Sequence, residues 1–440
     1  EEGGGEEDEE EVHEEVPAGG TLSAAVFGII KAMVGPAILY LPHGFTDAGY
    51  AVALPALLVT TCLFLYSSDC LLQCWKMEMA KMEEEALSEK YYGAISEKKK
   101  IKHLSYPRLA GMAYGKTVEK MVMNGIAAMQ LGVCLTYFIF VPQNLRMSLY
   151  SLFGILLPFW VYLVTMVAVQ IPLSWIRDIR RLTYTNVLAN FLILFGLITC
   201  LYFAFTAQDA KELLEKASHL ELVRPRWPLF IGTAVLLFEG SITLCIPLQE
   251  AVEDYEDRNA FPKVYKKTIT SIIMFYCIFG MVCWTAFGNH VNTVLTTSLP
   301  EGILATCVQL AYSLAVIFTF PLQAYPAHEI LSRLVAARNS GTKHLSATER
   351  NAVASFVVVS LSAVAFVEMD SLGHVVSLMG SLLGCPIAFV FPPMIYNKLE
   401  QRLDKRKWRI GNYTVAGLGL IGMVGASYST LSTWNSAGAE

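Results

Sequence analysis

Residues 31–42 read Lys-Ala-Met-Val-Gly-Pro-Ala-Ile-Leu-Tyr-Leu-Pro and lie inside an apolar run that begins at Leu22. The run is long enough to supply the roughly 20 apolar residues that a helix needs to cross a bilayer. Its centre holds Gly35 and Pro36, and a proline removes one backbone donor and disfavours helical geometry at the residue before it. We therefore expect a membrane-spanning helix over residues 21–46 that breaks at Gly35–Pro36.

A second apolar run, residues 227–251, carries a similar interruption. Residues 237–247 read Leu-Phe-Glu-Gly-Ser-Ile-Thr-Leu-Cys-Ile-Pro, with Glu239, Gly240 and Ser241 near the centre of the run. Gly240 relaxes a helix without steric cost. Backbone groups freed inside a membrane are tolerated only where protein, ligand or trapped water satisfies them. We therefore expect this helix to be unwound around Glu239–Ser241.

Composition places the whole chain in the membrane class. Of its 440 residues, 54% are hydrophobic and only 16% are charged, whereas a soluble domain carries about 25% charged residues. Its mean hydropathy is +0.45. A soluble protein could not cover so many apolar segments with a polar surface. The sequence thus predicts an all-α membrane protein. Without a nucleotide-binding loop, a Rossmann fingerprint or a zinc-binding HExxH motif, we expect neither an ATP-driven pump nor an enzyme, and no cofactor.

Cysteine and histidine positions argue against a metal site. All ten cysteines lie in apolar segments and are interpreted as small packing residues rather than disulfide partners. Four histidines, His43, His290, His328 and His374, lie near the ends of apolar runs and lack metal-ligand spacing. We expect these four to be interfacial, and we expect no bound metal.

Counting apolar runs of sufficient length predicts eleven membrane-spanning helices. They cover residues 21–46, 49–75, 116–146, 155–175, 182–207, 227–251, 264–287, 302–332, 350–368, 372–396 and 410–434.

Basic residues give an independent test of this count. With a cytoplasmic N-terminus, 27 of the 33 Lys and Arg residues fall in cytoplasmic connections and five fall on the opposite side. The remaining one, Lys31, lies inside the first span. Such an imbalance is the positive-inside pattern of a correctly counted topology, and a miscounted span would disrupt it.

The chain divides into a tail, a membrane domain and a linker. Residues 1–20 form the tail, and ten of its first fifteen residues are acidic, which is typical of a disordered segment. A solubility or spacing role is favoured over regulation. Residues 21–435 form the transmembrane domain, with a polar cytoplasmic linker over residues 77–115 that forms either an interfacial helix or a solvated loop. Residues 410–434 are an extra C-terminal helix outside the repeat described next.

The two interrupted helices are the first and the sixth of the predicted spans. A separation of five is expected if residues 21–207 and 227–396 are two halves of five helices each, and five being odd, the halves insert in opposite orientations. Half-helix N-termini then favour a carboxylate, and freed carbonyls favour an ammonium group or a cation, so a zwitterion suits both. The alternative is a pair of kinks that only shape packing, since Gly and Pro are common in membrane helices.

Two charged residues lie near the interruptions of these helices. Glu239 is interpreted either as a proton acceptor that couples protonation to substrate binding, or as a structural carboxylate bonded to freed amides or paired with Lys31, and the structural role is favoured. For Lys31, a structural ion pair is favoured over gating, because the residue lies too deep to reach the membrane edge easily.

Three polar residues lie in other spans. Gln130 and Tyr137 are seven residues apart and share one helix face, so they contact either substrate or a neighbouring helix. Thr319 either donates an oxygen to a cation or bonds its own helix backbone, and the second role is favoured.

Several of these motifs resemble the amino acid/auxin permease family, and within it the proton-assisted and vacuolar amino-acid transporters. The likeness covers residues 21 to about 400. It rests on residues 30–42, on Gln130-Leu-Gly-Val-Cys134 with Tyr137 and Asn144, on residues 176–182 and 188–190, on Phe238-Glu-Gly240, on Pro247-Leu-Gln-Glu250, on Pro326-Ala-His-Glu-Ile330 and on Pro392-Pro393.

The resemblance implies an APC/LeuT-like five-plus-five inverted repeat and secondary active transport of amino acids with H⁺ as the coupling ion. Na⁺ coupling, another small organic solute, and an amino-acid-sensing receptor are the alternatives. It also implies a monomer in a vacuolar, lysosomal or plasma membrane. One departure concerns residues 35–37, where the family reads Gly-small-Gly and this chain reads Gly-Pro-Ala. Another is Gly28, where some members have a His linked with proton coupling.

The resemblance places a substrate site at the two interruptions and a coupling site beside it. The expected substrate-binding residues are Met33, Val34, Gly35, Pro36, Ala37, Gln130, Tyr137, Phe238, Gly240 and Ser241. The expected proton or ion-coupling residues are Glu239, Lys31 and Thr319.

Overall fold

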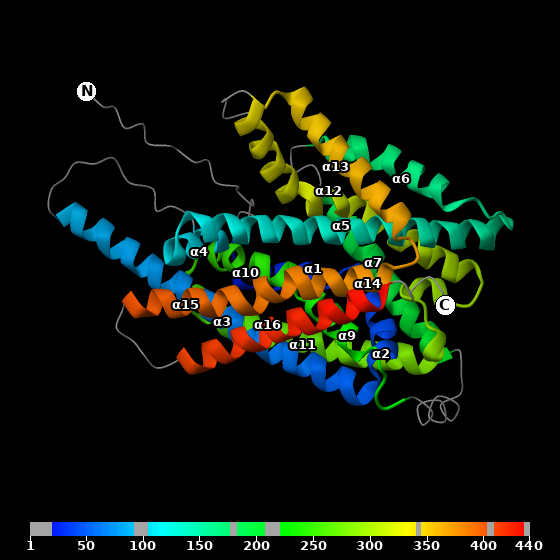
Figure 1. Cartoon of the computed structure of the whole chain (residues 1–440), viewed down its shortest axis with the longest axis horizontal. Helices are drawn as coiled ribbons and strands as arrows, with labels where there is room; N and C mark the ends of the chain where they lie inside the picture. The colour runs from blue at the N-terminus through cyan, green and yellow to red at the C-terminus, as the bar shows by residue number, and fades with distance from the viewer. Residues whose placement is uncertain are drawn as a thin grey trace.

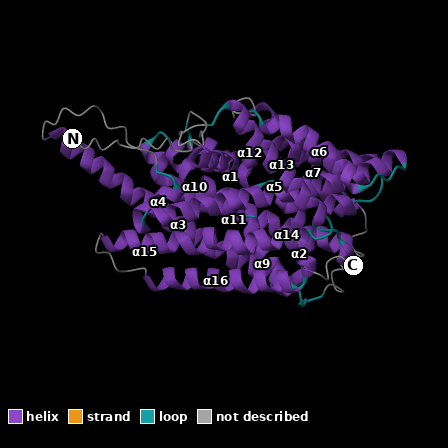
Figure 2. Cartoon of the chain, turned by 45° about the horizontal axis from the view of Figure 1, so that its top comes forward, coloured by secondary structure: helices purple, strands orange, loops and turns teal. Residues whose placement is uncertain are grey.

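The computed structural model describes residues 20–91, 104–176, 183–206, 221–339, 345–402 and 409–434. Throughout these ranges the regular structure is helical and no strand occurs (Figure 2). Long helices run roughly along the longest axis of the molecule (Figure 1). The acidic tail before Gly20 and the middle of the predicted linker lie outside these ranges, so the expectations about them stay predictions.

The helices of the first part of the chain are α1 (Leu22–Met33), the 3₁₀ helix η1 (Pro36–Tyr40), α2 (Leu41–Ala48), α3 (Tyr50–Tyr91), α4 (Tyr106–Tyr114), α5 (Lys116–Phe153), α6 (Phe159–Ser174) and α7 (Thr183–Thr206). Those of the second part are α9 (Trp227–Leu236), α10 (Glu239–Ala251), α11 (Tyr255–Phe287), η3 (Gly288–His290), η4 (Leu295–Ser298), α12 (Ile303–Asn339), α13 (Ala347–Val367), α14 (Leu372–Leu378), the π-helical η5 (Met379–Gly384) and η6 (Pro386–Val390), α15 (Phe391–Arg402) and α16 (Arg409–Ser432).

Length and apolar composition make this a multi-pass membrane protein. Nine helical segments of the described chain can each cross a bilayer, and α1 with η1–α2 forms a bent pair, at 41°, that makes a tenth. Helix α6, at 16 residues, is apolar but shorter than that criterion allows. The predicted all-helical membrane class is therefore confirmed.

The outer surface of the bundle is apolar, as expected of a chain surrounded by lipid. Helix α7 shows this clearly, since large side chains recur along its exposed side at helical spacing. The exposed side chains are Phe191, Leu194, Ile198, Tyr202 and Phe205. In water such a stripe would be costly, whereas a hydrocarbon solvent accepts it.

Helix α1 breaks where the sequence predicts. It ends at Met33, and regular structure resumes at Pro36 as a 3₁₀ turn that leads directly into α2. Because Pro36 has no N–H, the Ala32 carbonyl cannot receive the hydrogen bond that the fourth following residue normally donates. The Gly35 N–H instead donates to the Met33 carbonyl at 2.9 Å. Gly35 itself is extended, with φ −132° and ψ −167°, a conformation open to any residue.

The second interruption differs from its prediction. Helix α9 ends at Leu236 and α10 begins at Glu239, so the irregular residues are Leu237 and Phe238, while Glu239–Ser241 is helical. Both irregular residues keep right-handed helical torsions, and residues 227–251 form one candidate span. The expectation of an unwound stretch at Glu239–Ser241 is therefore wrong.

Gly240 serves helix packing instead of unwinding. A Cβ atom at this position would lie 2.4 Å from the Ala32 carbonyl oxygen of α1. Real Cβ atoms do not approach a backbone oxygen so closely, so only glycine lets the two helices meet at this point. The two interrupted helices are therefore in direct contact, as the sequence predicts.

Around this contact the helices form two groups. Helix α1 packs against α10 and α11, while α5 packs along α12, which also contacts α7. Helices α6, α12 and α13 lie together at one side of the molecule in both views (Figures 1 and 2). The α1 break consequently lies between α10 and α11, and η1 after the break contacts α5 through the rings of Tyr40 and Phe140, whose centroids are 6.3 Å apart.

Candidate functional site

The break in α1 exposes main-chain groups to a small region of free space. A Cβ atom added at Gly35 would meet nothing within 4 Å. On the other side, the Tyr276 hydroxyl of α11 donates to the Met33 carbonyl at 2.7 Å, and both residues are buried. One freed carbonyl is thus held by the protein, while open space borders the Cα atom of Gly35.

Consecutive residues at the start of α10 point to different neighbours, because successive side chains on a helix are rotated by about 100°. Phe238 stacks on Phe64 of α3, with ring centroids 4.4 Å apart. The Ser241 hydroxyl lies 2.6 Å from the Tyr265 hydroxyl of α11. Gly240 faces α1, as described above. Phe238 and Ser241, two expected substrate-binding residues, are therefore engaged in helix packing.

Glu239 points toward a third direction, where α5 and α12 meet. Its carboxylate accepts a hydrogen bond from Gln323 of α12 at 3.2 Å. The same Gln323 nitrogen also donates to the side-chain oxygen of Gln130 in α5. Gln130 and Glu239 are both buried. A chain of three polar side chains thus connects α10, α12 and α5 in a mostly apolar interior.

Sequence reasoning missed Gln323. An uncharged amide inside an apolar span is a weak signal, because it is often only a bond between helices. The signal that could have identified it is spacing: Gln323 follows Thr319 by four residues, so the two share one face of α12.

Gln130 and Tyr137 face α12 together, as their spacing predicts. Gln130 meets Gln323, and Tyr137 interacts with the Thr319 side chain. The Thr319 hydroxyl also donates to the Val316 carbonyl of its own helix at 3.2 Å, which is the backbone bond favoured from the sequence. Gln130, Tyr137 and Thr319 therefore lie along one interface between α5 and α12, with Glu239 at one end.

Lys31 does not complete this cluster. It lies half-buried in the last turn of α1, and among the described residues no carboxylate approaches it within ion-pair distance. A direct Lys31–Glu239 pair is thus absent, contrary to one interpretation of the sequence. Near a helix C-terminus a cation is favoured by the carbonyl dipoles, and this placement suits Lys31.

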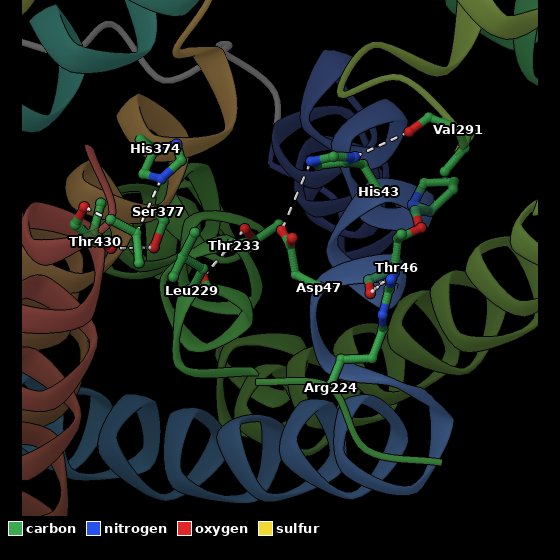
Figure 3. Close-up of polar contacts among 12 residues, drawn as sticks. His43, Thr46, Asp47, Arg224, Leu229, Thr233, Val291, His374, Ser377 and Thr430 are labelled. Carbon is green, nitrogen blue, oxygen red and sulfur yellow. Dashed lines mark hydrogen bonds and ion pairs between the residues drawn. The ribbon is translucent and has the colours of Figure 1, made fainter. Parts of the chain in front are cut away.

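Polar contacts along α2 tie this half-helix to its surroundings (Figure 3). The His43 Nδ1 atom lies 3.0 Å from the Val291 carbonyl, and its Nε2 atom lies 3.8 Å from Asp47. Arg224 donates to the Thr46 carbonyl at 2.9 Å. The half-helix after the break is therefore held both to the connection after α11 and to the segment before α9.

The histidines described here do not form a metal site. His374 in α14 bonds the Thr433 hydroxyl at 3.1 Å, and it is a separate contact from that of His43. In the described ranges no group of three or more His, Cys, Asp or Glu residues is arranged to hold an ion. The side chain of His290 lies outside the described part of the structure.

A small cavity of about 40 Å³ lies between α6, α12 and α13, and no residue of α1 or α10 lines it. Glu329 borders the cavity and accepts hydrogen bonds from Arg350 at 2.8 Å and from Arg333 at 3.3 Å. Such a volume holds water rather than an organic solute. We therefore regard this region as an ionic tie between α12 and α13, and the α1 break as the candidate site.

Comparison with known families agrees with these features. A family model described as transmembrane amino acid transporter protein matches residues 18–432. The family resemblance stated from the sequence motifs is thereby confirmed.

Individual relatives are moderately similar. Vacuolar amino acid transporter 3 of Saccharomyces cerevisiae is 27% identical over 429 residues, covering 93% of this chain and 56% of the yeast protein. Amino acid transporter ANT1 of Arabidopsis thaliana is 26% identical over 382 residues, covering 83% of this chain and 81% of that protein. The chain spans little more than half the length of the yeast relatives that it matches.

Among solved structures, Mhp1, a nucleobase-cation-symport-1 family transporter in a closed conformation, matches 94% of this chain and 92% of its own chain. The TM-score is 0.50 at 12% sequence identity, so the likeness concerns the fold alone.

Proposed function

Because the chain belongs to the family of transmembrane amino acid transporter proteins, we propose that it is a secondary active transporter that moves amino acids across a membrane. Transport would proceed by alternating access around a site at the α1 break. The observation that carries this proposal is the break itself, with room beside Gly35 and direct contact to α10 through Gly240. Alternating access forms and breaks no covalent bond, so we propose neither an enzymatic activity nor a cofactor for this chain.

The ends of the broken helix suit the two charges of an amino acid. The carbonyl end of α1 lies at the break, where an ammonium group is favoured. The start of η1 leaves the Ala37 N–H at the break, where a carboxylate is favoured, whereas the Ile38 N–H donates to the Gly35 carbonyl at 3.4 Å. We propose that Met33–Ala37 contribute through the main chain, and that Gln130 and Tyr137 contact the bound solute.

Phe238 and Ser241 would support the site indirectly. Their side chains are occupied by Phe64 and Tyr265, so we assign them to holding α10 in place. Gly240 would permit the close approach of α10 to α1. In this assignment α10 and the broken α1 border the site on two different sides.

We propose H⁺ as the coupling ion, with Glu239 as its acceptor. A carboxylate buried at depth in a membrane protein is costly unless it is partnered or functional, and Glu239 lies next to α1 in a polar cluster. Lys31 and Thr319 would act as supporting groups, Lys31 at the end of α1 and Thr319 beside Tyr137.

The proposed topology has eleven spans with a cytoplasmic N-terminus. It counts α6 as a span in addition to the ten segments found by length, and the distribution of basic residues supports it. The halves 21–207 and 227–396 would form the APC/LeuT-like inverted repeat, with α16 as the extra helix. A vacuolar membrane is the proposed location, by analogy with the yeast relative, and a monomer is the proposed state.

The test is uptake by the purified chain in liposomes, measured for a panel of amino acids under an imposed pH gradient, with and without Na⁺. Accumulation that follows the pH gradient and is abolished by a protonophore is the expected result. Accumulation that requires Na⁺ and ignores the pH gradient would replace H⁺ by Na⁺. Saturable binding of an amino acid without any flux would identify a receptor and overturn transport.

A further inference from the structure

We propose that Gln323 is a positioning residue whose amide orientation follows the protonation state of Glu239. Rotation of the Gln323 amide in turn reorients the Gln130 amide, across the interface between α5 and α12. This inference rests on the proposed function, because it assigns a partner to the proposed proton acceptor. It concerns a residue that none of the sequence motifs identifies. The chain of three side chains described above carries it.

The number of hydrogens on the Gln323 amide determines which groups donate and which accept in the hydrogen bonds from Glu239 to Gln130. A glutamine side chain has one NH₂ group with two hydrogens and one carbonyl oxygen. The Gln323 nitrogen donates one hydrogen to Gln130 and the other to Glu239. Both of its donors are therefore used on acceptor oxygens, and Gln130 must present its own oxygen toward α12.

When Glu239 is protonated, its contact with Gln323 requires an acceptor on Gln323 instead of a donor. An ionised carboxylate only accepts hydrogen bonds, whereas a protonated one carries an O–H that needs an acceptor. Rotation of the Gln323 amide by half a turn supplies its carbonyl oxygen to that O–H. The same rotation brings the Gln323 oxygen to the position that its nitrogen held next to Gln130. Gln130 must then rotate as well, so that its NH₂ group can donate to this oxygen. No covalent bond other than the O–H of Glu239 is formed or broken.

Among the groups around Glu239, the Gln323 amide can either donate a hydrogen bond to Glu239 or accept one from it. On α5, Cys134 and Tyr137 lie one and two turns after Gln130, and both are buried and neutral at physiological pH. From α12 come Gln323 and, one turn earlier, Thr319.

Neighbours on the other helices are engaged elsewhere. On α1 the charged side chain is Lys31, which forms no ion pair with Glu239. The α11 hydroxyls of Tyr265 and Tyr276 are bonded to Ser241 and to the Met33 carbonyl, and α3 contributes the apolar Phe64. Gln323 is therefore an uncharged neighbour that can serve either protonation state of Glu239.

Replacing the amide by an apolar group of similar size tests the proposal. Gln323→Leu removes a hydrogen bond donated to the ionised carboxylate, and so favours the protonated form of Glu239 up to a higher pH. We expect the pH of half-maximal uptake to shift upward by about one unit. Gln309→Leu is the matched control, because Gln309 is also an α12 amide but bonds Thr296 and Ser148 instead of Glu239.

An exchange of the two groups separates positioning from simple packing. Glu239→Gln alone should flatten the pH profile, whereas the double variant Glu239→Gln with Gln323→Glu restores one carboxyl facing one amide. We expect the double variant to regain a pH-dependent profile. A packing role for Gln323 would not produce this recovery.

A spectroscopic measurement makes the result independent of transport. Infrared titration of the purified protein should show a protonated-carboxyl band that is lost in Glu239→Gln, and its midpoint should move upward in Gln323→Leu but not in Gln309→Leu. Midpoints that coincide in Gln323→Leu and the unsubstituted chain would overturn the inference and leave the proposed function standing. Absence of gradient-driven uptake by the unsubstituted chain would overturn the proposed function, and the infrared midpoints would still decide the role of Gln323.

Discussion

The Tyr276 hydroxyl of α11 donates a hydrogen bond of 2.7 Å to the carbonyl of Met33, the last residue of α1. Both residues are buried, with Tyr276 fully so. A carbonyl released by a helix break in an apolar interior costs free energy unless a donor reaches it. Helix α11 thus stabilises the broken form of α1, and the break belongs to the fold rather than to a bound ligand.

Loss of this hydrogen bond should weaken both stability and binding. We expect Tyr276→Phe to lower the free energy of unfolding by about 1 kcal/mol and to raise the KM for the amino acid, because the end of α1 loses a fixed position. Thermal unfolding in detergent and uptake kinetics measure the two effects. Tyr265→Phe is the control, since Tyr265 bonds Ser241 and not the break. An unchanged KM in Tyr276→Phe together with normal stability would contradict this role.

Two glycines at the α1–α10 region should respond in opposite ways to the same substitution. Gly240→Ala places a methyl group 2.4 Å from the Ala32 carbonyl, so α10 must move away and uptake should fall by at least about tenfold. Gly35→Ala meets open space and an ordinary extended backbone, so the protein should fold normally. Size-exclusion profiles and uptake rates of the two variants provide the comparison. Normal folding and an unchanged uptake rate in Gly240→Ala would show that the helix contact at Gly240 is unimportant.

Neutralising Glu239 should uncouple uptake from the pH gradient while leaving exchange intact. Glu239→Gln keeps the size of the side chain and its capacity to bond Gln323, but it cannot take up a proton. We expect gradient-driven accumulation to fall to the level of a protonophore-treated sample, with amino acid exchange retained. Counterflow and net uptake in the same liposomes separate the two activities. Full accumulation by Glu239→Gln would exclude this residue from coupling.

The polar contacts of His43 in α2 should limit solvent access to the region next to Gly373. His43→Ala removes the bond to Val291 and the contact with Asp47, so a cysteine introduced at the nearby Gly373 should react faster with a hydrophilic maleimide. A Cβ at Gly373 would lie 3.6 Å from the His43 ring, which makes it a local reporter. The experiment uses a background in which the exposed Cys62 and Cys307 are serine.

Thr433→Ala serves as the control for this measurement, because it breaks the His374 contact and leaves His43 in place. Labelling rates that are the same with and without His43 would show that these contacts do not restrict access.

Local features of the sequence predicted local features of the structure. Pro36 cannot donate a backbone hydrogen bond wherever it lies, and with Gly35 before it this favours the break in α1, whereas Pro55 and Pro142 lie inside continuous helices. Likewise, Gln130 and Tyr137 share a face of α5 because helix periodicity is the same in every helix. The apolar runs marked the spans for the same reason, since their length is set by the bilayer.

Contacts between helices were not predictable in the same way. The sequence left Lys31 as a possible partner of Glu239, whereas the structure pairs Glu239 with Gln323, a residue 84 positions away. It suggested unwinding at Gly240, whereas the structure uses that glycine to bring α10 against α1. Each outcome depends on the rotation and register of one helix against another, which a one-dimensional pattern does not contain.

The sequence by itself therefore determined the membrane class, the family and the break at Gly35–Pro36, because these depend on composition, motif and backbone chemistry. Only the tertiary structure decided which side chains surround the break and which group Glu239 meets. The physical reason is that partners in a bilayer are selected by close packing and by hydrogen bonds between helices, and both require the helices to be in place.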